Sequence, residues 1–306
     1  MSIVAVVVTY NRMHDLEACL NALAGQTRPP DRVIVVDNGS TDGSRDFVLE
    51  QFPHFELYGA TENVGGAGGF SFGLDRAIAA GAEAAWLMDD DAEPTPTALE
   101  NLLKVQQANP DAPFWTSTTF FYDGTVEEAR AGIHLRAATT DIDRGDRTSA
   151  TTVATFVGVL VNLSLARFEP LPIADFFIWH DDSEYTSRLA RWSPGVRALE
   201  SRILHPYKEM YGDFGDRLRY DLRNRLWILT GGELANRKER RLQLALIPKI
   251  LLKQAIASKN KSKYLHNVGV GFREGLFRRP RLAMPGASYQ EGSFQRLGSV
   301  NRPSAD

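Results

Sequence analysis

The residues best suited to chemistry lie in three short polar clusters that each follow an apolar run: Thr9-Tyr10-Asn11, Asp37-Asn38-Gly39-Ser40 and Asp89-Asp90-Asp91. The three adjacent carboxylates repel one another, and the apolar run before them supplies no counter-charge. A hard divalent cation would neutralise them and could bridge them to a diphosphate. For an isolated triad the alternative is a solvated acidic turn that caps a helix at Thr95 or Thr97. The position of all three clusters after apolar runs favours a metal site.

The apolar runs before these clusters are typical of strands in a parallel sheet. Residues 3–8, 32–36 and 84–88 show no polar alternation, which indicates burial on both faces. Helical periodicity fills the intervals, with Asn11 as the expected cap of the first helix, and residues 55–59 form a further strand. The order β-α-β-α-β-α-β therefore predicts an open α/β sheet. Ligands bind beyond the carboxyl ends of such strands, so the three clusters should meet at one edge.

A glycine-rich stretch, Asn63-Val64-Gly65-Gly66-Ala67-Gly68-Gly69-Phe70, begins the helix that is expected to end near residue 80. Four glycines in five residues are costly in chain entropy, but they let a backbone approach a ligand closely. The start of the following helix offers free N–H groups to an anion. A tight loop with positive φ is the alternative, and it explains one or two of the glycines. The spacing matches neither a dinucleotide-binding motif nor a P-loop.

A second acidic cluster, His180-Asp181-Asp182-Ser183-Glu184, follows the aromatic residues 176–179. A carboxylate beside apolar walls can have a raised pKa and act as a general base. Capping of a helix by Asp181 or Asp182 explains the same residues, and the two roles are compatible. His205 follows the expected strand at residues 196–204. A lone histidine is more often structural than a metal ligand, so both roles stay open.

The remaining chain divides by its patterns. Strands are expected at residues 114–120 and 153–163, a hairpin or loop at 122–150, and helices from residue 214. The domains expected are a catalytic domain at 1–212, with a donor half at 1–92 and an acceptor and catalytic half at 93–212, a helical basic region at 213–281 and an irregular tail at 282–306.

Composition narrows the class of protein. A single cysteine, Cys19, excludes an internal disulfide and a cysteine-based zinc cluster. The first residues lack a basic segment and a cleavage site, and no stretch is long enough to span a bilayer. We therefore expect a soluble or peripheral protein of the cytoplasmic side.

Charge is distributed unevenly along the chain. Residues 237–281 hold thirteen Lys and Arg against two acids, whereas the net charge of the whole chain is −3. Apolar residues at 242–252 lie among these cations, so the segment is expected to bind an anionic membrane surface peripherally. The alternative is that a helix of this segment packs against the preceding part of the chain, residues 1–236, which is acidic. A nucleic-acid partner is not expected, because stacking aromatics are sparse.

In order, these motifs resemble those of the family 2 glycosyltransferases of GT-A fold. The matching motifs are Val6-Val7-Val8-Thr9-Tyr10-Asn11-Arg12, Val35-Val36-Asp37-Asn38-Gly39-Ser40-Thr41-Asp42, Asn63-Val64-Gly65, Asp89-Asp90-Asp91 and the acidic run from His180 to Glu184. The resemblance covers about residues 3–230. It implies an α/β fold with a mostly parallel central sheet flanked by helices, and an inverting mechanism.

The resemblance extends to a narrower group. The glycine-rich stretch, the triple aspartate and Tyr220-Asp221-Leu222-Arg223-Asn224-Arg225-Leu226 are similar to bacterial galactofuranosyl- and rhamnosyltransferases of cell-wall assembly. The short length and the HDDSEY run most resemble the galactofuranosyltransferases that initiate galactan synthesis in mycobacterial-type arabinogalactan. This implies a UDP-galactofuranose donor and a rhamnosyl-GlcNAc-diphospho-polyprenol acceptor at the inner face of the plasma membrane, with a homo-oligomer left open.

Three alternatives remain. They are rhamnosyl transfer from dTDP-rhamnose, a membrane-associated scaffold without activity, and a phosphohydrolase. The last expects Asp-x-Asp-x-Thr or Asp-x-Asp-x-Val after the first strand, whereas the aspartates here follow the fourth.

The resemblance also implies roles for individual residues. The general base is Asp182, in preference to Asp181. Mn²⁺ or Mg²⁺ would be bound by Asp89, Asp91 and His205, although the family's usual motif has a spacer between two acids. The nucleotide-sugar would contact Thr9, Tyr10, Asn11, Arg12, Asp37, Asn38, Asn63, Gly65, Gly66, Asp89 and Asp90. The acceptor or its diphosphate would contact Trp179, His180, Arg223 and Asn224.

Overall fold

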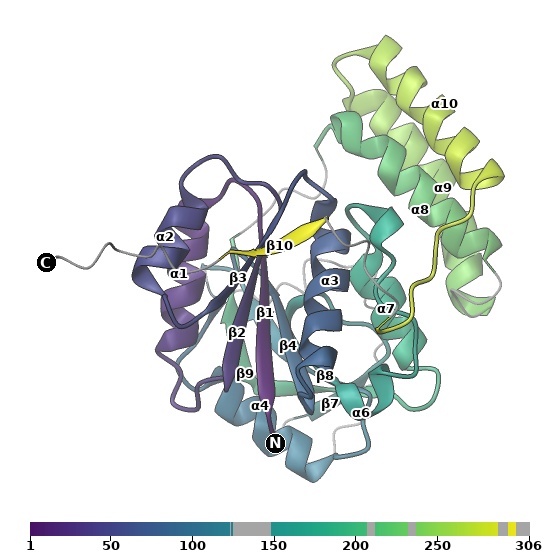
Figure 1. The fold of residues 1–306 in the computed structure, drawn as a ribbon. Coiled ribbons are helices and arrows are strands. Elements are labelled where there is room, and N and C mark those ends of the chain that lie inside the picture. The colour runs from purple at the N-terminus through teal and green to yellow at the C-terminus, as the bar shows by residue number, and fades with distance from the viewer. Residues whose placement is uncertain (123, 125–147, 207–211, 232–236, 287–292, 298–306) are drawn as a thin grey trace, which may run out of the picture.

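The predicted β-α-β-α-β-α-β order is confirmed by the computed structural model, which describes residues 1–122, 124, 148–206, 212–231, 237–286 and 293–297 (Figure 1). The expected hairpin or loop at 122–150 lies mostly outside the described residues. The elements of the first ninety residues are β1 (Ile3–Thr9), α1 (Met13–Ala24), β2 (Arg32–Asp37), α2 (Ser44–Gln51), β3 (Glu56–Ala60), α3 (Gly65–Ala79) and β4 (Ala84–Asp89).

The following elements complete the sheet and add the C-terminal helices. They are β5 (Glu93–Pro94), α4 (Ala98–Ala108), β6 (Phe114–Phe120), β7 (Thr148–Thr151), β8 (Val157–Asn162), α6 (Leu163–Ala166), η1 (Ala174–Phe176), α7 (Asp181–Leu189), β9 (Gly195–Leu204), η2 (Gly215–Arg217), α8 (Leu218–Thr230), α9 (Arg237–Ala257), α10 (Lys261–Phe277) and β10 (Phe294–Leu297).

One sheet holds all the strands of the described residues, in the order β10-β3-β2-β1-β4-β8-β6-β9-β5, with β7 paired to β9. The α/β class is confirmed, but the expectation of a mostly parallel sheet is too simple. Parallel pairing joins β3, β2, β1 and β4, and also β6 with β9. The pairs that involve β8, β5, β7 and β10 are antiparallel. The parallel part is the one that the apolar runs predicted.

Helices cover both faces of the sheet, so alternate residues of β1 are buried in two separate cores. Ile3, Ala5 and Val7 pack with buried side chains of α1, α2 and α4. Val4, Val6 and Val8 pack with α3, α6 and α7 on the other face. This arrangement explains why β1 is apolar at every position, since neither face meets water.

Two of the five glycines of α3, Gly69 and Gly73, serve the packing of that helix on the sheet. A Cβ added at Gly69 would lie 2.5 Å from Cγ1 of Val8, and one at Gly73 would lie 2.3 Å from Cγ1 of Val6. Both distances are far below van der Waals contact, so only glycine permits this approach. Within the glycine-rich stretch, Gly69 is therefore explained by helix–sheet packing rather than by a ligand.

The C-terminal helices form a separate layer beside the sheet domain (Figure 1). Leu222, Leu226 and Ile247 are its buried centre, with side chains of α10 packed against them. Gly275 of α10 lies so close to α8 that an added Cβ would meet Leu226 at 2.7 Å. No helix among the described residues is long and apolar enough to cross a bilayer.

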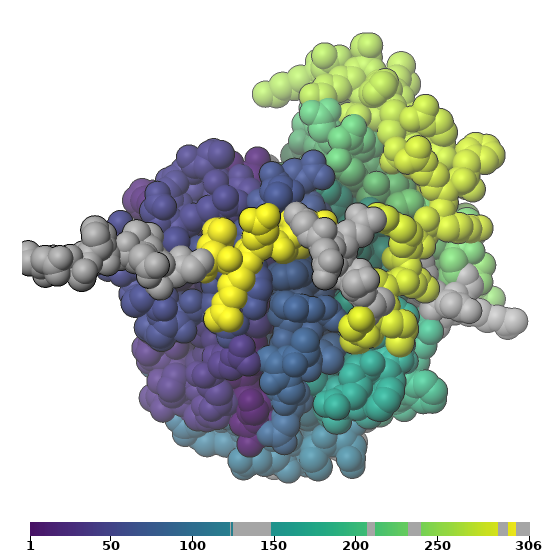
Figure 2. Space-filling view, in the orientation of Figure 1, coloured from purple at the N-terminus to yellow at the C-terminus, as the bar shows by residue number. Residues whose placement is uncertain are grey.

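The expectation of an irregular tail is wrong for residues 294–297. They form β10, which pairs antiparallel with β3 at the edge of the sheet. The ring of Phe294 stacks on Phe72 at 4.1 Å between centroids. Figure 2 shows the C-terminal residues, in yellow, crossing the surface of the N-terminal half. Four residues give no readable periodicity, so the strand is specified by an available sheet edge and one aromatic contact.

Candidate functional site

The three polar clusters do converge on one edge of the sheet. In the parallel register Thr9 of β1 is opposite Asp37 of β2, and Val8 is opposite Asp89 of β4. The last residues of three neighbouring strands therefore lie side by side, as the rule for parallel sheets predicts. The convergence follows from strand order alone, and it brings together residues that are up to eighty positions apart in the chain.

Asp89, Asp91 and His205 form a group that suits a divalent cation. One ligand atom from each lies within 4.8 Å of the others. Nε2 of His205 is 3.1 Å from Oδ1 of Asp91, and both residues are buried. His205 arrives at the end of β9, where its N–H donates to the carbonyl oxygen of Phe120. Two carboxylates and one imidazole leave room for phosphate oxygens and water in an octahedral shell, so the residues fit the ion.

Arg12 occupies the approach to this group. Its Nη1 lies 2.5 Å from Oδ2 of Asp91 and 3.5 Å from Oδ1 of Asp90. Burial raises the pKa of Asp90 to about 6, although a hydrogen bond from Thr9 and the charge of Arg12 act in the opposite direction. The guanidinium therefore neutralises part of the carboxylate charge that the sequence showed to be unbalanced.

Asp37 and Asn38 are buried within the strand edge. Asp37 accepts hydrogen bonds from the N–H groups of Gly39 and Ser40 and forms an ion pair with Arg45. Asn38 donates from Nδ2 to the carbonyl oxygen of Gly65. Arg45 was not identified from the sequence. Its place on α2, eight residues after Asp37, gives no signal in the chain.

Asn11 does not cap α1, because Arg12 occupies the N-cap position and makes no side-chain cap bond. Asn11 instead has a φ of +52°, which asparagine tolerates better than most residues. Its N–H donates to Oγ of Ser40, and its Oδ1 accepts from the N–H of Thr41. These bonds tie the loop after β1 to the loop after β2 and leave Tyr10 43% exposed at the edge.

The start of α3 contacts the protein's own backbone. Gly65 has a φ of +76°, and an added Cβ would lie 2.0 Å from the carbonyl oxygen of Phe177. The same oxygen accepts a hydrogen bond from the N–H of Ala67 at 3.2 Å. Oδ1 of Asn63 accepts from the N–H of Gly65. Around Gly66, in contrast, no described atom outside its chain neighbours and the backbone of its own helix lies within 4 Å of the Cβ position, so a ligand could approach there.

The segment that leads to the second acidic cluster is held in a strained conformation. Phe177, Trp179 and His180 all have φ between +65° and +71°. Each such residue costs about 1–3 kcal/mol, so the surroundings must maintain the shape. Nδ2 of Asn224 donates to the carbonyl oxygens of Phe176, Ile178 and Trp179, at 3.0 Å each.

Arg223 supports the same segment. Its Nη2 donates to the carbonyl oxygens of Asp175 and Phe176. Both Arg223 and Asn224 thus bind the backbone of this segment, and Arg223 also lies 3.6 Å from Glu274. Their expected contacts with the acceptor or its diphosphate stay a prediction. The two residues lie behind the segment and fix the position of the residues that follow it. Trp179 packs against Phe214, with 4.8 Å between ring centroids.

His180 is fixed by Asp221, a residue that the sequence reasoning did not select. Nε2 of His180 lies 2.9 Å from Oδ1 of Asp221, which also accepts from Nε of Arg225. Burial acts to raise the pKa of Asp221, but the hydrogen bond from His180 and the charge of Arg225 outweigh it and lower the pKa to about 2. The spacing of Asp221 and Arg225, four residues apart in an expected helix, is the signal that could have revealed the pair.

Asp181 and Asp182 form the first turn of α7, and His180 rather than either aspartate is the N-cap residue. Asp181 is buried and Asp182 is partly exposed. Burial raises the pKa of Asp181 well above its usual range, and the charges of Asp182 and Asp89 raise it further. Burial also raises the pKa of Asp182. Because Asp89 acts on Asp181, the second acidic cluster lies near the metal-ligand group.

The fold and this site define a glycosyltransferase. The chain belongs to glycosyltransferase family 2, since the model of that family, described as "Glycosyl transferase family 2", matches residues 4–163.

Among curated proteins, the galactofuranosyltransferase GlfT1 of Mycolicibacterium smegmatis is 32% identical over 211 residues, which are 66% of this chain and 70% of that protein. GlfT1 of Mycobacterium tuberculosis (strain H37Rv) is also 32% identical, over 67% of this chain and 70% of its own length.

Solved structures confirm the GT-A fold. TarS of S. aureus (1–349), solved with UDP-GlcNAc, has a TM-score of 0.57 at 13% identity and covers 90% of this chain and 81% of that one. The mannosyltransferase PcManGT of Pyrobaculum calidifontis, solved with GDP-Man and Mn²⁺, has a TM-score of 0.57 at 18% identity and covers 89% and 80%.

Proposed function

We propose that this protein is a metal-dependent, inverting glycosyltransferase that transfers galactofuranose from UDP-galactofuranose to a rhamnosyl-GlcNAc-diphospho-polyprenol. The observation that carries the proposal is the proximity of two acidic clusters from distant parts of the chain. Asp89 and Asp91 end the parallel half of the sheet, and Asp181 lies near enough to Asp89 for its charge to raise the pKa of Asp181. A donor and an acceptor hydroxyl need both clusters within one site.

The donor would lie along the edge formed by β1, β2 and β4. Tyr10 is exposed there and offers a ring for a base to stack on. The open space at Gly66 would let the sugar nucleotide approach the protein backbone closely. Asp37 and Asn38 are buried, so they would act by shaping this edge as well as by any direct contact.

A cation bound by Asp89, Asp91 and His205 would stabilise the negative charge that develops on the departing UDP. The imidazole nitrogen in the group supports Mn²⁺ over Mg²⁺, since Mg²⁺ prefers oxygen ligands throughout its shell. Asp89, Asp91 and His205 would thereby orient the donor so that the anomeric carbon of its sugar faces the second acidic cluster.

Asp182 would take the proton from the acceptor hydroxyl. It is partly exposed, whereas Asp181 is buried, so an acceptor can reach Asp182 more easily. Its raised pKa makes it a stronger base than an ordinary aspartate. The deprotonated oxygen attacks the anomeric carbon from the side opposite UDP, and one displacement inverts the configuration.

The helical layer would hold the enzyme on the inner face of the plasma membrane. Large apolar side chains of α9 and α10 are exposed, and cations lie among them. The exposed apolar residues are Leu244, Leu252, Ile256, Leu265, Leu276 and Phe277. Lys249 and Lys253 of α9 are exposed beside this set. Apolar insertion combined with attraction to anionic lipids is sufficient for peripheral binding. We accordingly propose residues 1–212 as the catalytic domain and 213–281 as the membrane-proximal region.

A donor screen tests the proposal. Purified protein with Mn²⁺ and a rhamnosyl-GlcNAc-diphospho-polyprenol would be incubated with UDP-galactofuranose or dTDP-rhamnose, and UDP and dTDP would be titrated separately. We expect transfer from UDP-galactofuranose and tighter binding of UDP. Transfer from dTDP-rhamnose with tighter dTDP binding would establish the rhamnosyltransferase alternative. Failure to bind or transfer from either donor would contradict the enzymatic proposal.

A further inference from the structure

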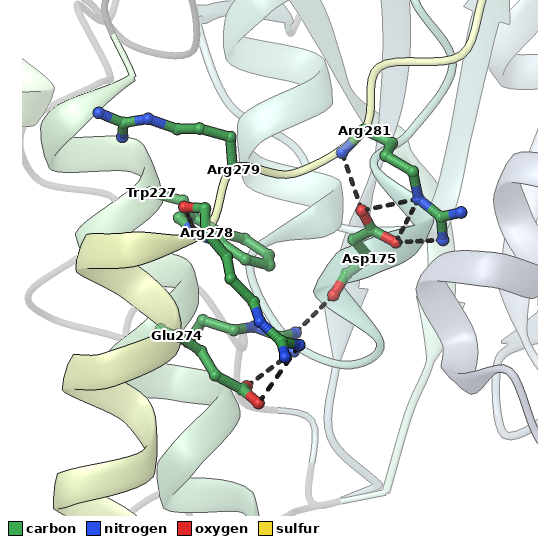
Figure 3. Close-up of a pocket in the computed structure, with 7 residues that line it drawn as sticks. Asp175, Trp227, Glu274, Arg278, Arg279 and Arg281 are labelled. Carbon is green, nitrogen blue, oxygen red and sulfur yellow. Dashed lines mark hydrogen bonds and ion pairs between the residues drawn. The ribbon is translucent and has the colours of Figure 1, made fainter.

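A cavity of about 440 Å³ lies behind the strained segment, between η1, α8 and the chain that leaves α10 (Figure 3). Four arginines, two acids and Trp227 line it. A water molecule occupies about 30 Å³ in the liquid, so this volume holds about fifteen waters. The cavity lies outside the group formed by Asp89, Asp91 and His205, and nothing in the proposed sugar transfer uses it.

The acids of the cavity neutralise only part of its positive charge. Asp175 accepts from the N–H of Arg281 and pairs with its guanidinium, at 2.8 Å each. Glu274 lies 3.6 Å from Arg223 and 3.9 Å from Arg278. Two carboxylates against four guanidinium groups leave a surplus of two positive charges.

Part of this positive charge is fixed in a desolvated position. Arg223 is 8% exposed and lies over the ring of Trp227, at 4.5 Å from its centroid. Arg278, in contrast, is exposed at the rim of the cavity. A planar guanidinium can bind two phosphate oxygens at once. It is also more weakly hydrated than an ammonium, so it loses its water at a lower cost. The surplus of two charges matches a terminal phosphate, which carries close to two negative charges near neutral pH.

The residues on either side of the arginines indicate which kind of molecule would bear such a phosphate. Leu276 and Phe277 precede the arginines and are 49% and 84% exposed. Leu282 and Met284 follow them and are 43% and 44% exposed. Apolar side chains on both sides of a cation cluster are typical of a segment that enters a bilayer interface while its cations contact head groups. A soluble phosphate would not require them.

We propose that this cavity binds the terminal phosphate of a membrane lipid. Arg278 would contact the phosphate at the rim, with Arg223 behind it, and the four apolar side chains would lie in the interface. Arg279 points away from Arg278 and donates to Oγ1 of Thr230, so it would have to turn toward the phosphate to contact it (Figure 3). The choice of a lipid rests on the membrane association proposed above, whereas the anion site itself rests only on the cavity and its charges.

The site is also connected to the acidic cluster by the geometry of Arg223. Its guanidinium donates to the carbonyl oxygens of Asp175 and Phe176, directly before the three residues with positive φ. An anion that shares this guanidinium would thus bind next to the segment that positions Asp181 and Asp182. Lipid binding and the arrangement of the proposed base are coupled through one side chain.

Vesicle co-sedimentation of the full chain tests the proposal. Phosphatidylcholine vesicles would carry either phosphatidic acid, which has a terminal phosphate, or phosphatidylglycerol, matched for surface charge. We expect the unmodified protein to bind phosphatidic acid about tenfold more tightly, and the double variant Arg278→Gln/Arg279→Gln to lose this preference. The matched control is Arg241→Gln/Lys253→Gln, which removes two exposed cations of α9. It should weaken binding to both lipids and keep the preference.

Equal binding of both lipids by the unmodified protein would overturn the proposal, as would a preference that survives in the Arg278→Gln/Arg279→Gln variant. Inorganic diphosphate is the third arm. If it binds without vesicles as tightly as phosphatidic acid binds, and the same variant abolishes that binding, the site takes a soluble anion and the lipid assignment is wrong. UDP affinity, measured for every variant, should not change. If the unmodified protein did not bind UDP, the proposed sugar transfer would be contradicted, whereas the measured preference for phosphatidic acid would still stand.

Discussion

Arg12 and Asp91 form an ion pair at the centre of the metal-ligand group. Nη1 of Arg12 lies 2.5 Å from Oδ2 of Asp91, while Nε2 of His205 lies 3.1 Å from the other oxygen, Oδ1. The carboxylate that should bind a cation is therefore already balanced by a side chain of the same strand edge. A divalent ion at this position must compete with the guanidinium, since both require the same negative charge.

This competition predicts that Arg12→Ala binds Mn²⁺ more tightly in the absence of nucleotide, by about fivefold, which corresponds to about 1 kcal/mol. Titration calorimetry with Mn²⁺ alone measures the effect. Arg28→Ala, which removes a partly exposed arginine paired with Asp31, is the control and should leave Mn²⁺ affinity unchanged. Weaker Mn²⁺ binding by Arg12→Ala would show that Arg12 supports the ion instead of competing with it.

Removal of a proposed metal ligand should have the opposite effect. Asp91→Asn and His205→Ala are each expected to weaken Mn²⁺ binding at least tenfold, because each removes an atom that would bind the ion directly, and even the loss of a residue that only orients such a ligand costs about 10–100-fold in affinity. Chelation with EDTA should abolish sugar transfer, and added Mn²⁺ should restore it. Transfer that continues at full rate in EDTA would exclude a role for the ion.

Asp182→Asn should abolish transfer without changing donor affinity. Loss of a general base lowers the rate by about 10²–10⁴-fold, and Asp182 has no described contact with the β1–β2 edge. The rate is measured with saturating donor, and UDP affinity is measured separately. Asp46→Asn is the matched control, since Asp46 also occupies the first turn of a helix and is exposed. If Asp181→Asn were inactive and Asp182→Asn active, the base would be Asp181.

The glycines of α3 should separate into structural and ligand-facing positions. Gly65→Ala and Gly69→Ala are expected to lower the melting temperature by several degrees, because each new Cβ overlaps an existing atom. Gly66→Ala should leave the melting temperature unchanged or raise it, since the space around it is open and alanine favours a helix. A decrease in UDP affinity in Gly66→Ala, measured by titration, would mark the approach of the donor. Unchanged UDP affinity would place the donor elsewhere.

Asp221 predicts a defined pH dependence of stability. Its pKa in the folded protein, about 2, is below the ordinary value of 3.8, so the folded state holds this proton less tightly than the unfolded state. The stabilisation is complete above about pH 4 and is lost as the pH falls toward 2; it amounts to about 2 kcal/mol. Asp221→Asn should lower the free energy of unfolding by about 3–5 kcal/mol at neutral pH, since it leaves a buried arginine unpaired.

Urea denaturation at several pH values measures this difference. The gap in stability between the unmodified protein and Asp221→Asn should narrow between pH 4 and pH 2. A gap that stays constant over this interval would mean that the carboxylate is not the source of the stabilisation. Glu17→Gln, on the exposed side of α1, is the control and should show no such pH dependence.

The sequence alone determined the sheet edge at which the site forms. Uninterrupted apolar runs identify strands that are buried on both faces, and the alternation of such runs with helices leaves parallel pairing as the simple solution. Once β1, β2 and β4 are parallel neighbours, their last residues must meet, so Thr9, Asp37 and Asp89 were predictable as one edge.

Other features were decided only by the tertiary structure, because they depend on contacts between segments that carry no local signal. His205 joins Asp91 through the path of β9, and Asn224 reaches the strained segment from a helix more than forty residues away. The glycine-rich stretch was interpreted as a place where the backbone approaches a ligand, yet its Gly69 is needed for the packing of α3 on Val8. Periodicity and local propensity report how a residue relates to its neighbours in the chain. They do not report which distant residue a side chain contacts, because that is decided by how the helices and strands pack in three dimensions.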